Sequence, residues 1–231
     1  MKANTPSLIL YFSACFFTIL FNLIGQEEYV FYAKSLVVPS IFIYYLTTNN
    51  YKIDLIKGGI FLFSFIGDVF ILMSDSNSEV GSVLSFLTVY LLLIIHLVNG
   101  FKKLKFNRTD VLSILCVIFV MLVLSFTILS LQFEKMKTDF SIIIMYSIIL
   151  GTLICISVVN YITKSNYAFL NLVLMSTCFL LSDVFYVLNG FYLSLFTFSL
   201  IEIITQVFSY FFMVNYFIEN DKVLKKIDAC P

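Results

Sequence analysis

Charged residues are scarce in this sequence. Asp, Glu, Lys and Arg together make up 12% of the 231 residues, whereas soluble domains contain about 25%. Hydrophobic residues make up 61%, so we expect an all-α, polytopic membrane protein. Tryptophan is absent, and tyrosines such as Tyr29 and Tyr51 are the expected anchors at the membrane interfaces. The net charge is zero, which gives no electrostatic reason to expect nucleic acid as a partner.

The motifs of several enzyme classes are also missing. The chain has one histidine, no HExxH zinc motif and no GxSxG serine motif. Its five cysteines are odd in number and form no CxxC pair, which argues against a disulfide framework and against a zinc site. We therefore expect neither a metal nor a cofactor, and any catalysis has to come from other side chains.

Apolar runs of the length that spans a bilayer, about 20 residues, occupy most of the chain. The first run is followed by Gly25 and a polar stretch rather than by a small-residue cleavage site, so we interpret it as a retained helix and not as a signal peptide. The loops are too short for a soluble domain, which predicts a single transmembrane domain over residues 1–231. Eight spans are predicted, at residues 8–24, 32–47, 58–73, 80–98, 111–131, 140–162, 168–188 and 191–218.

Basic residues favour the cytoplasmic side of a membrane protein, so their distribution predicts its orientation. With eight spans, both termini lie on one side. We expect that side to be the cytoplasm and the membrane to be a bacterial inner membrane. The side of the termini holds Lys2, Lys52, Lys57, Lys102, Lys103, Lys105, Arg108, Lys164, Lys222, Lys225 and Lys226, whereas the opposite side holds Lys135 and Lys137.

Two aspartates lie inside predicted spans, in nearly the same local sequence. Gly-Asp-Val-Phe surrounds Asp68, and Ser-Asp-Val-Phe surrounds Asp183. An ionisable side chain within a membrane is energetically expensive, so it usually has a function. About half the chain separates the two, which predicts a 4+4 parallel internal repeat with halves 1–110 and 111–231. Both aspartates would then lie on the third helix of a half, at matched depth, facing one cavity.

Two carboxyl groups in one site favour acid/base catalysis, because one can hold a proton while the other is ionised. Two other interpretations use the same residues. In a structural protein, Asp68 and Asp183 would join helices through hydrogen bonds. In a proton-coupled transporter, they would relay protons across the membrane.

Three more polar residues fall within or beside the spans. Lys34, at the outer end of the second span, could pair with a carboxylate, hold a phosphate or simply reach the interface. Glu202, in the last span, could join the same cavity or pair with Lys34. His96 lies near the cytoplasmic end of the fourth span, opposite in depth to the aspartates, and is predicted to be a structural or gating residue.

The motifs around these residues resemble those of the lysoplasmalogenase family, the YhhN-like membrane proteins, over essentially the whole chain. Gly67 with Asp68 matches the family's Gly-Asp motif, and Ser182 with Asp183 matches its Ser-Asp motif. The chain departs from the family pattern at Ser35, Ile95 and Asn215. The other matches are Lys34 with Pro39 to a Lys-Pro-Leu segment, His96 to Gly-His-Leu, and Tyr210 with Asn215 to a closing Tyr and Gln segment.

The resemblance implies an activity, which is hydrolysis of the vinyl ether bond of lysoplasmalogen to a fatty aldehyde and a glycerophospho-base. Its acid/base pair would be Asp68 and Asp183. Vinyl ethers hydrolyse by protonation of carbon to an oxocarbenium ion and then addition of water, and glycosidases use paired carboxyl groups on a related ion. The expected partner is a lysophospholipid or another single-chain lipid, drawn from the bilayer. The implied substrate-binding residues are Lys34, Glu202, Tyr210 and Asn215.

Overall fold

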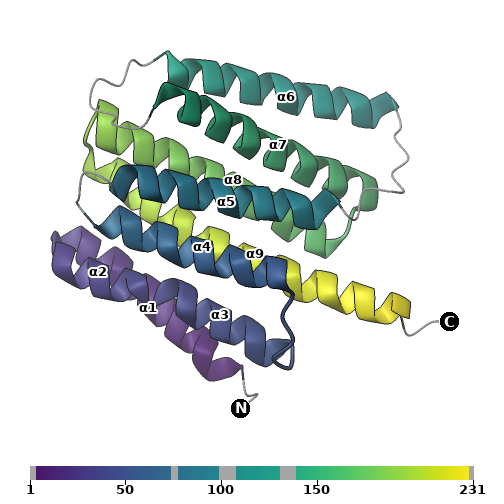
Figure 1. The fold of residues 1–231 in the computed structure, drawn as a ribbon, viewed down its shortest axis with the longest axis horizontal. Helices are drawn as coiled ribbons and strands as arrows, with labels where there is room; N and C mark the ends of the chain where they lie inside the picture. The colour runs from purple at the N-terminus through teal and green to yellow at the C-terminus, as the bar shows by residue number, and fades with distance from the viewer. Residues whose placement is uncertain (1–3, 74–77, 99–107, 131–138, 229–231) are drawn as a thin grey trace.

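The computed structural model describes residues 4–73, 78–98, 108–130 and 139–228. Over these residues the chain forms a bundle of α-helices with one π-helical turn and no strand, which confirms the predicted all-α class. The helices α1 to α3 lie along one edge of the bundle and α6 along the opposite edge (Figure 1). The elements are α1 (Thr5–Ile24), α2 (Glu27–Ser35), α3 (Val37–Thr48), α4 (Leu55–Leu72), α5 (Ser78–Val98), α6 (Arg108–Leu129), α7 (Phe140–Lys164), α8 (Tyr167–Val187), η1 (Leu188–Tyr192) and α9 (Phe196–Asp228).

Helices α2 and α3 form one membrane segment that is interrupted at Leu36. Pro39 has no backbone N–H, and its ring would clash with the carbonyl group four residues earlier, which belongs to Ser35. The first helix of the pair therefore ends at Ser35. The interruption leaves Lys34 in the last turn of α2, where the partial negative charge of the helix C-terminus favours a cation.

Seven segments of the described chain are long and apolar enough to cross a membrane. They correspond to seven of the eight predicted spans. The remaining predicted span is α6, whose apolar part within the described residues runs Ile114–Ile128 and is shorter than a full crossing. Eight helical segments are therefore present as predicted, and seven of them meet the length and hydropathy of a crossing.

Two predicted spans had boundaries that were wrong by several residues. The second segment begins at Glu27 rather than at residue 32, because acidic residues in the first turn are stabilised by the helix dipole and extend the helix beyond the apolar run. The last segment begins at Phe196, after the π-helical turn, and continues to Asp228 rather than ending at residue 218. A helix does not have to end where it leaves the hydrocarbon, so hydropathy alone misses this extension.

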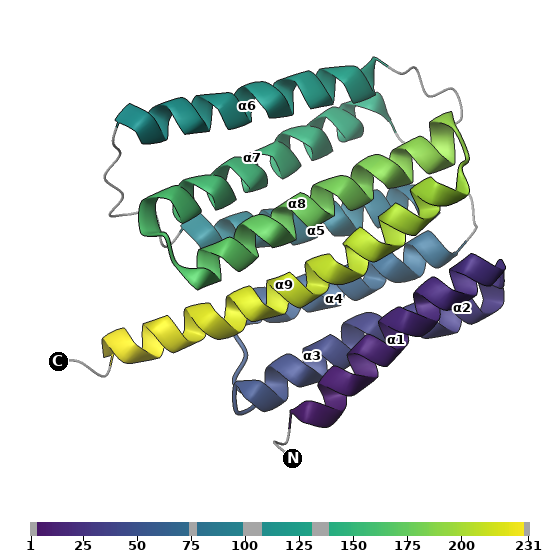
Figure 2. The same cartoon turned by 180° about the vertical axis from the view of Figure 1, so that it is seen from behind.

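Both ends of the chain lie at the same end of the bundle, which we call the proximal end (Figures 1 and 2). There, Asn4 Nδ2 donates a hydrogen bond to Thr48 Oγ1 at 3.1 Å. At the opposite, distal end, Ser199 Oγ donates to Asn22 Oδ1 at 3.3 Å. An even number of helical segments agrees with this arrangement. Which end faces the cytoplasm stays a prediction, since its basis includes residues outside the described ranges, namely Lys2, Lys102, Lys103, Lys105, Lys135 and Lys137.

Helices α4 and α5 approach closely because each has a glycine opposite an aromatic ring of the other. A Cβ atom on Gly67 would lie 2.8 Å from Phe86 Cε2, and one on Gly81 would lie 2.9 Å from Phe70 Cδ1. Small residues of this kind let membrane helices pack backbone to backbone. The glycine of the Gly-Asp motif therefore has a packing role next to Asp68.

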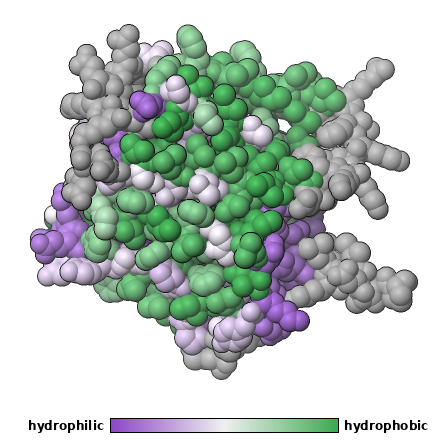
Figure 3. Space-filling view, viewed as in Figure 1, coloured by the Kyte–Doolittle hydropathy of each residue, from purple (hydrophilic) through white to green (hydrophobic). Residues whose placement is uncertain are grey.

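Apolar side chains cover the middle of the molecular face seen in Figure 3, and hydrophilic ones gather toward the two ends of the bundle. On α6, Phe119, Leu122 and Phe126 are 67%, 64% and 76% exposed. Exposed apolar patches of this size mark a surface that another apolar phase covers. The surface therefore fits a multi-pass membrane protein whose middle band faces lipid.

Candidate functional site

Asp183 lies near the distal end of α8, four residues before its last residue, Val187. Its Oδ2 atom accepts hydrogen bonds from the hydroxyl groups of Tyr90 on α5 and Tyr146 on α7, each at 2.7 Å. The two tyrosine rings meet edge to face with their centroids 5.5 Å apart, which is a favoured aromatic geometry. Because both donors use Oδ2, the other carboxyl oxygen, Oδ1, remains for a ligand.

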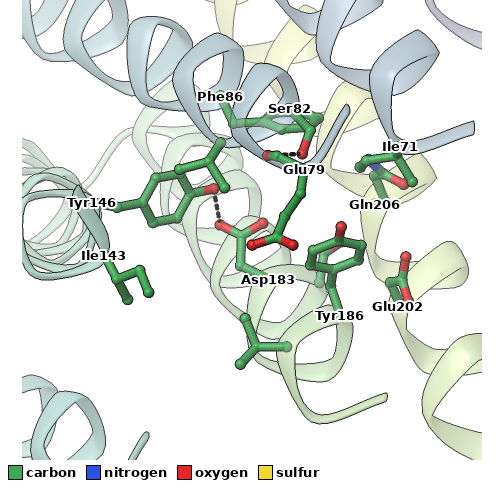
Figure 4. Close-up of a pocket in the computed structure, with 13 residues that line it drawn as sticks. Ile71, Glu79, Ser82, Phe86, Ile143, Tyr146, Asp183, Tyr186, Glu202 and Gln206 are labelled. Atoms are coloured by element: carbon green, nitrogen blue, oxygen red, sulfur yellow. Dashed lines mark hydrogen bonds between the residues drawn. The ribbon is translucent and has the colours of Figure 1, made fainter. Parts of the chain in front are cut away.

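Asp183 also lines a cavity of about 70 Å³ between α4, α5, α7, α8 and α9, which we call the polar cavity (Figure 4). Glu79 and Glu202 line it too, so three acidic side chains surround one small space. The described residues contain no group of three or more His, Cys, Asp and Glu side chains arranged to hold a metal ion. The lining residues are Ile71, Glu79, Ser82, Val83, Phe86, Ile143, Tyr146, Ser182, Asp183, Tyr186, Val187, Glu202 and Gln206.

Asp68, on α4, is buried within the protein, with 1% of its surface exposed. It is not among the residues that line the polar cavity. Its Oδ1 accepts hydrogen bonds from Gln206 Nε2 at 2.7 Å and from the Tyr210 hydroxyl at 2.9 Å, both on α9. Asp68 Oδ2 and Gln206 Oε1 are buried without a partner among the described residues. Buried acceptors normally have a donor, so these two oxygens are available to a ligand or to a proton.

Gln206 connects the two aspartates, because it lines the polar cavity beside Asp183 and donates to Asp68. The tyrosines that bind the two carboxyl groups are also close to each other. The Phe179 ring lies between them, 5.3 Å from the ring of Tyr90 and 6.0 Å from the ring of Tyr210. The two aspartates are therefore neighbours, with Asp183 at the cavity wall and Asp68 behind Gln206.

Lys34 and Glu202 complete this buried group. Lys34 is 3% exposed and Glu202 is 7% exposed. Lys34 interacts electrostatically with Asp68 and with Glu202, and Glu202 interacts with both aspartates. A cation among carboxyl groups offsets their mutual repulsion, which is strong where water is excluded. Lys34 therefore supplies a positive charge within this buried group.

Apolar space continues from Asp183 toward α6. A second cavity, the bridging cavity, also measures about 70 Å³ and shares Asp183 and Tyr146 with the polar cavity. A third, the α6–α7 groove, measures about 380 Å³ and shares Met121, Ser125 and Ser147 with the bridging cavity. Asp183 thus lies where a polar wall changes to an apolar one. The groove is lined by Ile118, Met121, Leu122, Ser125, Phe126, Ile144, Ser147, Ile148, Gly151 and Cys155.

A separate polar cluster lies at the proximal end. Lys57 of α4 forms an ion pair with Asp221 of α9, and their side chains are 5% and 13% exposed. The Tyr45 hydroxyl and Asn49 Nδ2 donate to Asp221 Oδ2 at 3.0 and 3.2 Å. His96 interacts electrostatically with this ion pair. Its position at the end of α5 places His96 away from the aspartates, at the depth expected for a structural or gating residue.

Replacing Asp221 with asparagine is expected to lower the free energy of unfolding by about 3 kcal/mol, because it leaves Lys57 buried without its counter-ion. The measurement is thermal unfolding of the purified protein in detergent. The matched control is Glu219→Gln, which removes the exposed Lys222–Glu219 pair and should change stability by less than about 1 kcal/mol. Equal effects of the two variants would show that the buried pair does not hold α4 to α9.

The other expected site residues divide between the two ends. Tyr210 contacts Asp68, as described above. Asn215 lies nine residues beyond Gln206 on α9, about 13 Å further toward the proximal end at 1.5 Å per residue. It is half-buried and does not line any of the three described cavities.

Three residues of the site, Gln206, Tyr90 and Tyr146, did not stand out in the sequence. Glu202, Gln206 and Tyr210 follow one another at intervals of four along α9, and residues four apart lie on one face of a helix. That spacing is visible in the sequence and points to Gln206. Tyr90 and Tyr146 carry no such signal, because a tyrosine within an apolar run equally fits a packing role.

The fold and the site together define a multi-pass helical membrane protein with a buried group of carboxyl side chains near one membrane face. The chain belongs to the YhhN family, whose family model matches residues 29–218. This confirms the family resemblance of the sequence motifs, and the matched range contains every expected site residue. No curated protein and no solved structure matches the chain.

Proposed function

We propose that this protein is a membrane-embedded lysolipid hydrolase that cleaves the vinyl ether bond of lysoplasmalogen. The observation that carries the proposal is the position of Asp183, which lines both the polar cavity and the apolar bridging cavity. In a lysoplasmalogen, the vinyl ether joins an apolar tail to a polar glycerol and head group. A lipid placed with its tail toward α6 and its glycerol in the polar cavity brings that bond to Asp183.

The reaction needs one group that gives a proton and one that takes a proton. The first protonates the outer vinyl carbon, which leaves an oxocarbenium ion. Water then adds to this ion and loses its proton to the second group, and the hemiacetal breaks into a fatty aldehyde and a glycerophospho-base. Asp183 lines the cavity together with Glu79 and Glu202, and of the two glutamates only Glu202 is buried, at 7% exposed. We therefore assign the two roles to Asp183 and Glu202.

Asp68 supports this pair from behind. It receives hydrogen bonds from Gln206 and Tyr210, and Gln206 forms part of the cavity wall. Asp68 therefore holds the Gln206 amide in one orientation. Lys34, which is 3% exposed and lines none of the three described cavities, offsets the negative charge of the group.

We also propose that the two halves of the chain form the 4+4 parallel repeat. Asp68 on α4 is bound by Tyr210 of the second half, and Asp183 on α8 is bound by Tyr90 of the first half. Exchange of partners between halves is what a pseudo-twofold axis through the bundle produces. In that arrangement, both termini face the cytoplasm and the site lies in the outer half of a bacterial inner membrane.

The test is a product assay on the purified protein in detergent, with lysoplasmalogen as substrate and the ester analogue lysophosphatidylcholine as control. We expect aldehyde from the vinyl ether lipid and neither aldehyde nor fatty acid from the ester. Detergent removes any proton gradient, so a proton-coupled transporter would release no product. Absence of aldehyde from every vinyl ether lysolipid tested would contradict the proposal and favour the transporter.

A further inference from the structure

We propose that the α6–α7 groove binds the hydrocarbon tail of a single-chain lipid and that Gly151 sets the length of tail it accepts. The inference deepens the proposed function and rests on it for the identity of the lipid. The first observation is that the three cavities are continuous. The bridging cavity shares lining residues with the polar cavity on one side and with the groove on the other.

The groove has the orientation of a lipid tail in one leaflet. Tyr146, beside Asp183, lies six residues from the distal start of α7, whereas Cys155, at the far end of the groove, lies fifteen residues from it. The nine residues between them span about 13 Å at 1.5 Å per residue. That length is close to half of a hydrocarbon core of about 30 Å. A tail in the groove therefore runs from the site toward the middle of the bilayer.

The walls of the groove are apolar and open to the membrane. Phe126 and Leu122 of α6 and Ile148 of α7 line it and are 76%, 64% and 62% exposed. The hydroxyl of Ser147 donates to that of Ser125 at 2.8 Å, so these two polar groups satisfy each other within the wall. No charged residue lines the groove among the described residues, which leaves a hydrocarbon chain as the ligand that fits.

Gly151 lies in the middle of α7, where glycine destabilises a helix relative to alanine. A Cβ atom at this position would lie 3.7 Å from Met121 Cε, at ordinary contact distance. The backbone of α7 therefore does not require a glycine for close packing here. The missing side chain instead leaves groove volume between α6 and α7, five residues or about 7.5 Å along α7 from Tyr146, which is beyond the end of a hexanoyl tail.

The test measures binding, which does not depend on hydrolysis. Hexanoyl, decanoyl and myristoyl lysophosphatidylcholine are titrated against the purified protein in detergent. Wild-type protein should bind the myristoyl lipid most tightly. In Gly151→Leu, the myristoyl lipid should bind at least about tenfold more weakly while the hexanoyl lipid binds as before, since the methylenes kept out of the groove lose their packing contacts with its walls.

The matched control is Thr152→Leu, the neighbouring exposed position on α7, which does not line the groove and should leave the tail preference unchanged. Met121→Ala is the opposite variant, because it enlarges the groove and should favour the myristoyl lipid further. If Gly151→Leu weakens all three lipids equally or none of them, or if wild-type protein binds none, the groove does not hold the tail.

The outcomes separate the groove from the proposed reaction. Length-dependent binding that Gly151→Leu shifts, with no aldehyde from any vinyl ether lipid, supports the groove and removes the hydrolase. Aldehyde release with a tail preference that Gly151→Leu leaves unchanged supports the hydrolase and removes the groove.

Discussion

Asp183→Asn is expected to lower the rate of aldehyde release from lysoplasmalogen by about 10³-fold, the typical contribution of a general acid or base. Asparagine keeps a side-chain oxygen that can accept the hydrogen bonds of Tyr90 and Tyr146. It cannot give or take a proton at the bond that is cleaved. The protein should therefore stay folded and bind lysolipid while turnover is lost. The measurement is aldehyde formation under saturating substrate, with thermal unfolding as the check on folding.

Asp139→Asn is the matched control, because it makes the same chemical change at the exposed position before α7. Its turnover should equal that of wild type. Turnover within about threefold of wild type in Asp183→Asn would show that this carboxyl group takes no part in proton transfer. In that case, Glu202 would be the only acidic group proposed to act in the polar cavity.

The helical bundle could be predicted from hydropathy because a membrane leaves few alternatives for an apolar chain. The errors fall where the helix and the apolar run are different lengths. α9 continues to Asp228, past its last apolar residues, and α2 begins at Glu27, before its first. In both places, charged residues continue a helix outside the hydrocarbon, and hydropathy interprets such residues as loop.

The site could be predicted in part. Asp68, Asp183, Lys34 and Glu202 stand out because a charge inside an apolar run is costly and therefore conspicuous. Their grouping in one buried cluster depends on how the helices pack. The sequence suggests it only through the matched depth of the two aspartates. Lys57 is the converse case. The sequence distinguishes it in no way from the other basic residues on the side of the termini, whereas in the structure it is buried and paired with Asp221, a residue far away in the sequence.

The relation between the two aspartates could not be predicted, because it depends on a third residue. Equal depth on two helices is compatible with carboxyl groups that face one space or with carboxyl groups in adjacent layers. In the structure Asp183 lines the cavity and Asp68 does not. Gln206 joins them, since its amide donates to Asp68 and its side chain lines the cavity of Asp183. Only the packing of α9 between α4 and α8 determines this.

Asp68→Asn is therefore expected to lower turnover less than Asp183→Asn does, by about 10²-fold, and to act on kcat rather than on KM. The asparagine oxygen can still accept hydrogen bonds from Gln206 and Tyr210, so the fold is kept. The change removes the ionisable group behind the amide, which does not line the cavity in which the lipid is proposed to bind. The measurement is the full substrate dependence of aldehyde release for both aspartate variants.

A double-mutant cycle that combines Gln206→Met with Asp68→Leu, which cannot accept a hydrogen bond, tests whether Asp68 acts through Gln206. Methionine is close in shape to glutamine and removes the hydrogen bond to Asp68. If Asp68 works by orienting that amide, each single variant breaks the same connection, so the double variant should be about as slow as the slower single one. If the two losses multiply, Asp68 reaches the substrate by a path of its own, and the two aspartates then act directly on the lipid as the sequence motifs first suggested.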